Sequence, residues 1–404
     1  MKRLISLVAP LAVATSCGPP PVRAHMSAPF MVAAGGVSNP TVALAPDGAP
    51  LIAWVGQDGN VFVARRADQG AFGKPVRAND VAGEAAPHEQ APAQVATGPE
   101  AQVYVIWQTR MPIAGRRFPA SDLRFARSTD GGRSFEPART VNDDAGGTPT
   151  SHTFHDLYVD RSGTVFVSWI DGRTTEEARH AGSGHGAPLG PEVRVARSAD
   201  GGKTFSASVV VDGDACPCCR TSLARGPDGA VYIAWRKIFA GDVRDIVVAR
   251  STDGGASFAA PVKVHGDGWV YPGCPHAGPS IAVDGAGTLH VVWYTGAEGR
   301  AGLYLAASRD GARTFDAPQA LSGNGIAPVS HARLAPTGDG VWVAWEDRGK
   351  SGGRVSLSRS GSDGVLHFAG ELGGEGRSPA IAAVGDAAAV AWLANDTVRA
   401  VVTP

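Results

Sequence analysis

The chain has 404 residues, of which 53 are glycines and 29 are prolines, so these two residues make up about a fifth of it, against a usual share of roughly 12%. With 43% hydrophobic and 19% charged residues it can bury a large core, which excludes a disordered protein and favours many short strands over helical bundles or doubly wound α/β folds. The net charge of −1 indicates no nucleic-acid partner, and no stretch beyond the N-terminus is apolar enough to span a bilayer.

Residues 1–17 have the parts of a bacterial export signal: a positive start at Lys2 and Arg3, then a short apolar run that ends in small residues. Cys17 follows directly and resembles the lipidated cysteine of a lipobox. We therefore expect a lipoprotein-type signal peptide and a periplasmic protein anchored to the outer membrane through Cys17. Ordinary cleavage to a soluble periplasmic or secreted form is the alternative. The Pro-rich residues 18–29 are expected to form a tether.

A strand-like segment that ends in tryptophan recurs at intervals of 47 to 66 residues. Each copy alternates large and small apolar residues, which is the period-two pattern of a packed strand. The seven tryptophans are Trp54, Trp107, Trp169, Trp235, Trp293, Trp345 and Trp392.

The same four short strands are expected in each repeat. In one copy they are Ser280–Val283, the strand ending at Trp293, Leu303–Ala307 and Pro318–Leu321. Four antiparallel strands repeated around an axis form a β-propeller. The sequence therefore predicts an all-β propeller of seven four-stranded blades, with six blades as the alternative.

The two ends of residues 30–404, which we expect to form a single propeller domain, are incomplete repeats. The last repeat stops after its third strand at Val398–Val402, whereas Phe30–Ala34 precedes the first repeat and belongs to none. We expect this N-terminal strand to complete the seventh blade and close the ring.

A second motif, Ser-x-Asp-Gly-Gly-x-Ser/Thr-Phe with Ala for the second Gly in its last copy, follows the third strand of four repeats. Aspartate folds back on the amides of its own turn, glycine accepts a positive φ, and the aromatic ring packs under the blade. The aspartates are therefore expected to be structural. The four copies are Ser128–Phe135, Ser198–Phe205, Ser251–Phe258 and Ser308–Phe315.

These four copies resemble the Asp-box, or BNR repeat, of the sialidase superfamily, and the resemblance covers residues 30–404. It implies a sialidase-like fold, but working sialidases also have an early Arg-Ile-Pro segment, an arginine triad, a Tyr–Glu nucleophile pair and an aspartate acid/base. The corresponding first strand here is Ser38–Val42, which has no arginine. The superfamily usually has six blades rather than seven. Both departures argue against a working sialidase.

In a propeller, the loops that lead into the first strands and the loops that leave the second strands share one face, opposite the Asp-box turns. On this face the sequence gathers all four cysteines that follow Cys17 and half of the ten histidines beyond the tether. They are His88, His152, His155, Cys216, Cys218, Cys219, Cys274, His276 and His331.

Two main interpretations of the cysteines stay open. Thiolates and imidazoles suit copper(I) or zinc, so this face is a candidate metal site. Because an exported protein meets an oxidising compartment, disulfides are the other interpretation, and thiol redox chemistry is a third. The candidate metal ligands are Cys216, Cys218, Cys219, Cys274, His276, His152, His155 and His331.

The same face also carries arginines, carboxylates and a tyrosine. If a sialidase-type mechanism operates, the resemblance implies substrate-binding arginines, a nucleophile pair and a general acid, and otherwise these residues form a solvated polar rim. The candidates, in that order, are Arg220, Arg236 and Arg377; Tyr294 with Glu346; and Asp171.

The leading hypothesis is therefore an exported, sialidase-like Asp-box lipoprotein that binds copper, zinc or another ligand at its Cys/His-rich face. An exo-sialidase-type glycoside hydrolase, with a glycan as ligand, is the first alternative. A protein-interaction scaffold is the second.

Overall fold

The computed structural model describes residues 26–403 except 68–69, 117, 181–189, 322–330, 350–351 and 386. The expected signal peptide, the lipidation site Cys17 and most of the tether lie outside the described residues. Among the described residues, no helix is both long and apolar enough to cross a membrane.

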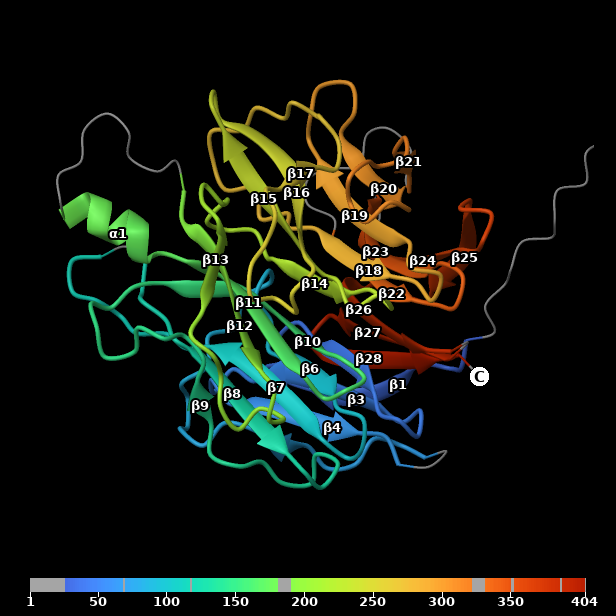
Figure 1. The fold of residues 1–404 in the computed structure, drawn as a ribbon. Helices are drawn as coiled ribbons and strands as arrows, with labels where there is room; N and C mark the ends of the chain where they lie inside the picture. Colours follow the sequence, from blue (N-terminus) through green and yellow to red (C-terminus); the bar gives the residue numbers. More distant parts are fainter. Residues whose placement is uncertain are drawn as a thin grey trace, which may run out of the picture.

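Seven four-stranded antiparallel sheets form the blades of a propeller (Figure 1). Blades 1 and 2 are β2 (Thr41–Leu44), β3 (Pro50–Val55), β4 (Val61–Arg65), β5 (Val76–Arg77), and β6 (Gln94–Thr97), β7 (Val103–Gln108), β8 (Leu123–Ser128), β9 (Arg139–Thr140). Blades 3 and 4 are β10 (His152–Val159), β11 (Val165–Asp171), β12 (Glu192–Ser198), β13 (Val209–Asp212), and β14 (Ser222–Arg225), β15 (Val231–Phe239), β16 (Val243–Ser251), β17 (Val262–Lys263). Blades 5 and 6 are β18 (Ser280–Val283), β19 (Leu289–Thr295), β20 (Gly302–Ser308), β21 (Gln319–Ala320), and β22 (Ala332–Pro336), β23 (Val341–Gly349), β24 (Gly352–Ser360), β25 (Leu366–Leu372). Blade 7 is β26 (Arg377–Val384), β27 (Ala387–Ala394), β28 (Thr397–Val402) and β1 (Phe30–Ala34), and one helix, α1 (Arg173–His180), follows β11.

The ring is closed by the N-terminal strand, as expected. β1 pairs antiparallel with β28, with Phe30 opposite Ala400 and Ala34 opposite Thr397, so blade 7 is built from both ends of the chain (Figure 1). The Ser27 amide extends this pairing by donating to the carbonyl of Val402 at 2.9 Å. Seven blades are confirmed, and the six-blade alternative is wrong.

The repeated tryptophans hold neighbouring blades together. Each of the seven core clusters combines residues of two adjacent blades, and each contains one of the repeated tryptophans. Trp169 and Trp235, for example, are fully buried against the preceding blade. Truncating such a side chain to alanine typically lowers the free energy of unfolding by about 3–5 kcal/mol, so these tryptophans contribute strongly to the packing between blades.

The Asp-box turns connect the third and fourth strands, and their polar groups are satisfied within the turn. In one of them the Asp200 carboxylate accepts hydrogen bonds from the Lys203 and Thr204 amides and from the hydroxyls of Thr204 and Ser198, at 2.7 to 3.0 Å. The hydrogen bond from Thr204 is the main reason why the pKa of Asp200 is low. These aspartates are structural.

Candidate functional site

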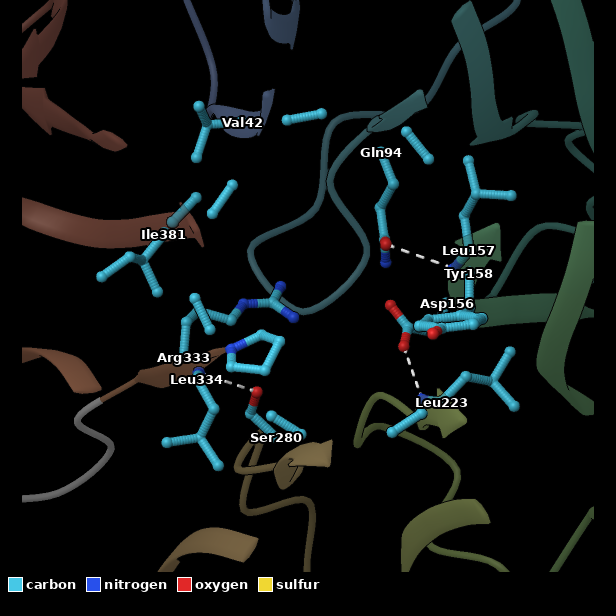
Figure 2. Close-up of a pocket in the computed structure, with 18 of the residues that line it drawn as sticks. Val42, Gln94, Asp156, Leu157, Tyr158, Leu223, Ser280, Arg333, Leu334 and Ile381 are labelled. Carbon is cyan, nitrogen blue, oxygen red and sulfur yellow. Dashed lines mark hydrogen bonds between the residues drawn. The ribbon is translucent and has the colours of Figure 1, made fainter. Parts of the chain in front are cut away.

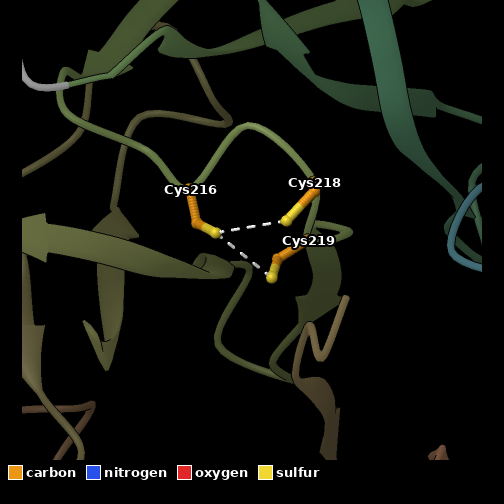
Figure 3. A group of neighbouring side chains, drawn as sticks. All are labelled: Cys216, Cys218 and Cys219. Carbon is orange, nitrogen blue, oxygen red and sulfur yellow. Dashed lines mark hydrogen bonds between the residues drawn. The ribbon is translucent and has the colours of Figure 1, made fainter. Parts of the chain in front are cut away.

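Three cysteine side chains meet in the loop between β13 and β14. The Cys216 Sγ lies 3.6 Å from the Cys218 Sγ and 3.4 Å from the Cys219 Sγ (Figure 3). The three sulfurs lie within 4.8 Å of one another, and all three side chains are buried. The structure therefore places three of the four candidate cysteines in one cluster.

Backbone hydrogen bonds fix the loop that carries this sulfur cluster. The Cys216 amide donates to the Arg236 carbonyl at 2.8 Å, and the Cys219 amide donates back to the Cys216 carbonyl at 3.4 Å. The resulting turn directs the sulfurs toward one another. From the neighbouring blade, the Ala277 amide donates to the Cys219 Sγ at 3.3 Å.

Positive charge surrounds the sulfurs. The Arg244 Nη1 donates to the Cys216 Sγ at 3.3 Å. Hydrogen bonds from the other two thiols, together with the charges of Arg236 and Arg244, lower the pKa of Cys216. The hydrogen bond with Cys216 raises the pKa of Cys218, and burial raises that of Cys219. These contacts favour the thiolate form at Cys216 over the other two cysteines.

The other candidate metal ligands on blade 5 lie outside this cluster. Cys274 and His276 are exposed, although Ala277, the next residue, contacts Cys219. The His276 ring lies 5.7 Å from the His88 ring, centroid to centroid, and the residue has a φ of 50°. His276 therefore precedes a residue that contacts the sulfur cluster, but its own side chain lies at the surface.

The remaining histidine candidates use ring nitrogens in hydrogen bonds. His152 contacts the Ser121 carbonyl with Nδ1 at 2.6 Å and the Asp144 carboxylate with Nε2 at 3.0 Å. The Nε2 of His155 faces the Pro92 carbonyl at 3.1 Å, and burial lowers the pKa of His155 to about 4.

In the same way, the His331 Nδ1 lies 2.7 Å from the Gln90 side-chain amide, and its Nε2 lies 3.0 Å from the Glu89 carboxylate. Two of these three rings thus use both nitrogens, and His155 retains a buried Nδ1 without a partner.

Two of the three candidate substrate-binding arginines are occupied by backbone carbonyls. Buried Arg220 donates to the carbonyls of Pro279 and Ala332, and buried Arg236 donates to three carbonyls, those of Ala277, Arg244 and Tyr294. Both guanidinium groups therefore tie blades together. The third candidate, Arg377, is exposed at the start of β26.

The candidate nucleophile pair and the candidate acid are also engaged in the fold. The Tyr294 ring packs edge-on against Trp269 at 5.7 Å, and the Glu346 carboxylate accepts from the Ser378 amide at 3.3 Å. Fully buried Asp171 accepts from the indole of Trp169 at 2.8 Å and from the Arg173 side chain at 2.9 Å.

A ring of seven side chains, six of them polar, lines the central channel, and the sequence motifs did not point to it. Each is the innermost-strand residue that pairs with the position before the repeated tryptophan, and five of the seven accept a hydrogen bond from the next blade. The sequence carries a signal for these five, because each stands thirteen residues before its tryptophan. We call this set the inner ring: Thr41, Gln94, Asp156, Ser222, Ser280, Arg333 and Ala380.

Comparison with known proteins identifies the fold. No family model matches the chain, and no curated protein matches its sequence. Among solved structures, an ulvan lyase bound to a GlcA–Rha3S ligand aligns with a TM-score of 0.61 at 14% identity, over 93% of this chain and 95% of that one. An α-L-arabinanase of Penicillium chrysogenum aligns with a TM-score of 0.54 at 13% identity, over 94% and 98%. A Hadza microbial sialidase aligns with a TM-score of 0.52 at 15% identity, over 85% and 73%. The chain therefore has a sialidase-like propeller fold, which glycoside hydrolases and polysaccharide lyases share.

Proposed function

We propose that the protein is an exported, sialidase-like propeller that binds copper(I) at Cys216, Cys218 and Cys219. The observation that carries this proposal is the meeting of three buried sulfurs, with those of Cys218 and Cys219 lying 3.6 and 3.4 Å from the Cys216 Sγ. Thiolates select copper(I) and zinc among the first-row metals.

The spacing of the sulfurs suits a shared metal ion. At a metal–sulfur distance of about 2.3 Å, two ligating sulfurs lie about 3.8 to 4.0 Å apart, so the cluster needs to widen by only a few tenths of an ångström. Structural zinc almost always takes four ligands. The described residues offer a group of three here, with no histidine or carboxylate among them, which favours three-coordinate copper(I).

The surrounding charges suit the complex as well. Copper(I) held by three thiolates carries a net charge of −2, which is costly to bury without compensation. Arg236 and Arg244 act on Cys216, and Arg220 interacts with Cys219, so three buried guanidinium groups supply the compensating charge.

The test is copper(I) loading of anaerobically purified protein against a competing chelator. Wild-type protein is expected to bind one copper(I) per chain, and Cys218→Ser or Cys219→Ser to weaken binding at least 100-fold. Cys274→Ser, which changes an exposed cysteine outside the cluster, is the matched control and leaves affinity within about twofold. Cysteines oxidised to disulfides in protein isolated from the periplasm, or preferential binding of zinc, would refute copper(I) binding.

Labelling with palmitate tests the lipid anchor. The label should be lost in Cys17→Ser.

A glycan ligand is the second candidate, because an exposed aromatic platform lies on the same face. The Tyr271 ring is 39% exposed and packs 5.2 Å from the Trp269 ring, and sugar rings stack on such surfaces. The ulvan lyase, arabinanase and sialidase with similar structures also act on carbohydrates. Turnover of a fluorogenic sialoside or arabinoside that is lost in Tyr271→Ala and in Arg377→Ala would support this function. Full copper binding without turnover would argue against it.

A further inference from the structure

The inner ring is a chain of side-chain hydrogen bonds that runs from blade to blade. The Val95 amide donates to Thr41 at 3.2 Å, the Leu157 amide to Gln94 at 3.3 Å, and the Leu223 amide to Asp156 at 2.6 Å. Two further links continue it: the Ile281 amide donates to Ser222 and the Leu334 amide to Ser280, each at 3.1 Å. Five junctions between blades, from blade 1 to blade 6, are linked in this way.

The ring is open at the two remaining junctions, which are contiguous. In the other five links the donor is the amide one residue after the ring position of the next blade, so the corresponding donors here are the Ile381 amide toward Arg333 and the Val42 amide toward Ala380. Neither of these side chains has an acceptor oxygen. Both amides therefore lack the side-chain acceptor that the other five amides of the ring have.

Arg333 places a positive charge beside the two open junctions. Its side chain points into the channel toward Asp156 and Gln94 (Figure 2). Among the described residues, its guanidinium forms no hydrogen bond and no ion pair, in contrast to Arg220, which donates to two carbonyls. Burial lowers the pKa of Arg333. The charge of Asp156 acts against this shift, but no described residue accepts a hydrogen bond from the half-buried guanidinium, so its donors are available to a ligand in the channel.

We propose that a small oxyanion, a carboxylate or a phosphate, binds in the central channel at Arg333 and completes the inner ring. A guanidinium group offers two parallel donors to an oxyanion, and the Ile381 and Val42 amides add two more donors on the same side of the channel. The channel has a volume of about 330 Å³, which accommodates such an anion with water. Asp156 on the opposite wall accepts from the Leu223 amide, and burial raises its pKa while the charge of Arg333 lowers it, so an anion would compete with Asp156 for the guanidinium.

The position of this site gives it a structural role. Blade 7 is the blade in which the two ends of the chain meet, and the open junctions lie on both of its sides. An oxyanion that links blades 6, 7 and 1 would therefore stabilise the closure of the propeller. The proposal is independent of copper binding.

The experiment measures thermal unfolding of the purified protein in sodium acetate or sodium phosphate, with sodium chloride as the control at equal ionic strength. Binding at 100 times Kd is expected to raise the Tm of the wild type by about 3 °C. The increment should disappear in Arg333→Gln. Ser280→Ala, which breaks one link of the ring away from the gap, is expected to lower the Tm but to retain the increment.

Arg333→Ser is a second variant, which keeps the test valid if Arg333→Gln does not fold. A serine at this position offers the Ile381 amide the acceptor found in the other blades, so this variant should be at least as stable as the wild type in chloride, yet insensitive to acetate and phosphate. No increment in the wild type up to 100 mM of either anion, or an equal increment in both Arg333 variants, would overturn the proposal. A response to only one of the two anions identifies which class the site takes.

Discussion

The two faces of the propeller differ in how far their loops repeat from blade to blade. On the Asp-box face the same turn occurs four times, and in each copy the aspartate accepts from the amides three and four positions later. On the opposite face each loop differs from the others, and the loops of blades 3 to 5 bring together buried sulfur, arginine and carboxylate groups.

This contrast separates structure from function within one repeated fold. A residue type that recurs in every blade solves a problem that every blade has, such as turning the chain or packing against a neighbour. A buried polar group that occurs once either answers a need of one blade junction, as Arg236 does, or serves a function, because its desolvation cost must be offset by some partner. The predictions below test whether the two faces differ in this way.

The largest expected effect compares an aspartate from each face. Asp171→Ala leaves the buried Trp169 indole without its acceptor and removes one of the carboxylates that bind Arg173, which keeps Asp143, and should lower the free energy of unfolding by about 3 kcal/mol. Asp200→Ala removes hydrogen bonds at an exposed turn and should cost about 1 kcal/mol. Urea unfolding measures both. Equal costs would show that the two faces do not differ in this respect.

A second comparison uses two glycines. Gly202 in an Asp-box has a φ of 81°, and a Cβ there would lie 2.6 Å from the Cε1 of Phe125. Gly202→Ala should therefore cost about 2–3 kcal/mol. Gly213, in the loop leading to the cysteines, has no atom within 4 Å of a Cβ, and its φ is not in the left-handed range. Gly213→Ala should raise stability by about 0.5 kcal/mol, and a loss comparable to that of Gly202→Ala would contradict the contrast.

The sequence predicted the repeated features well and the singular ones poorly. The seven tryptophans fix the number of blades because each occupies one interface between blades, and the unmatched strand Phe30–Ala34 identifies the closure. Their spacing is a local signal that needs no knowledge of three-dimensional contacts.

The site depends on contacts between distant segments, which spacing does not reveal. The sequence assigns Cys274 to the same face as the other three cysteines but does not say whether it joins them. In the structure it is exposed and lies outside their cluster. Arg220 and Arg236 are of the residue type that binds substrate carboxylates. The backbone carbonyls that they bind instead come from residues up to 112 positions away. Five positions of the inner ring could have been predicted from the sequence, because each stands thirteen residues before a repeated tryptophan.

A third prediction uses pH. Burial alone would lower the pKa of His152, but its hydrogen bond with Asp144 and the nearby Asp171 raise it. A histidine whose pKa is raised in the folded state contributes stability that is complete below its unfolded pKa near 6.5 and is lost as the pH rises through the folded value. The stability difference between wild type and His152→Gln should therefore shrink from pH 6 to pH 9.

His290 gives the opposite sign and serves as the control. Burial lowers its pKa, so its contribution is present above pH 6.5 and is lost as the pH falls. Urea unfolding of His152→Gln and His290→Gln at pH 5, 6, 7 and 9 separates the two trends. Parallel profiles for the two variants would refute opposite pKa shifts for these histidines.

The smallest expected effect concerns a strained residue beside the sulfur cluster. His276 has a φ of 50°, where most side chains are unfavourable, and its ring is exposed, so glycine should relieve strain without creating a cavity. His276→Gly is expected to raise the free energy of unfolding by about 0.5 kcal/mol. Asn395→Gly, at a φ of 54° in the turn between β27 and β28, should gain less, because the short polar side chain of asparagine tolerates this region. If His276→Gly is instead destabilising, the imidazole contributes to folding. If it stabilises while it slows copper(I) uptake, the strain is retained for the side chain's role at the surface of the cluster.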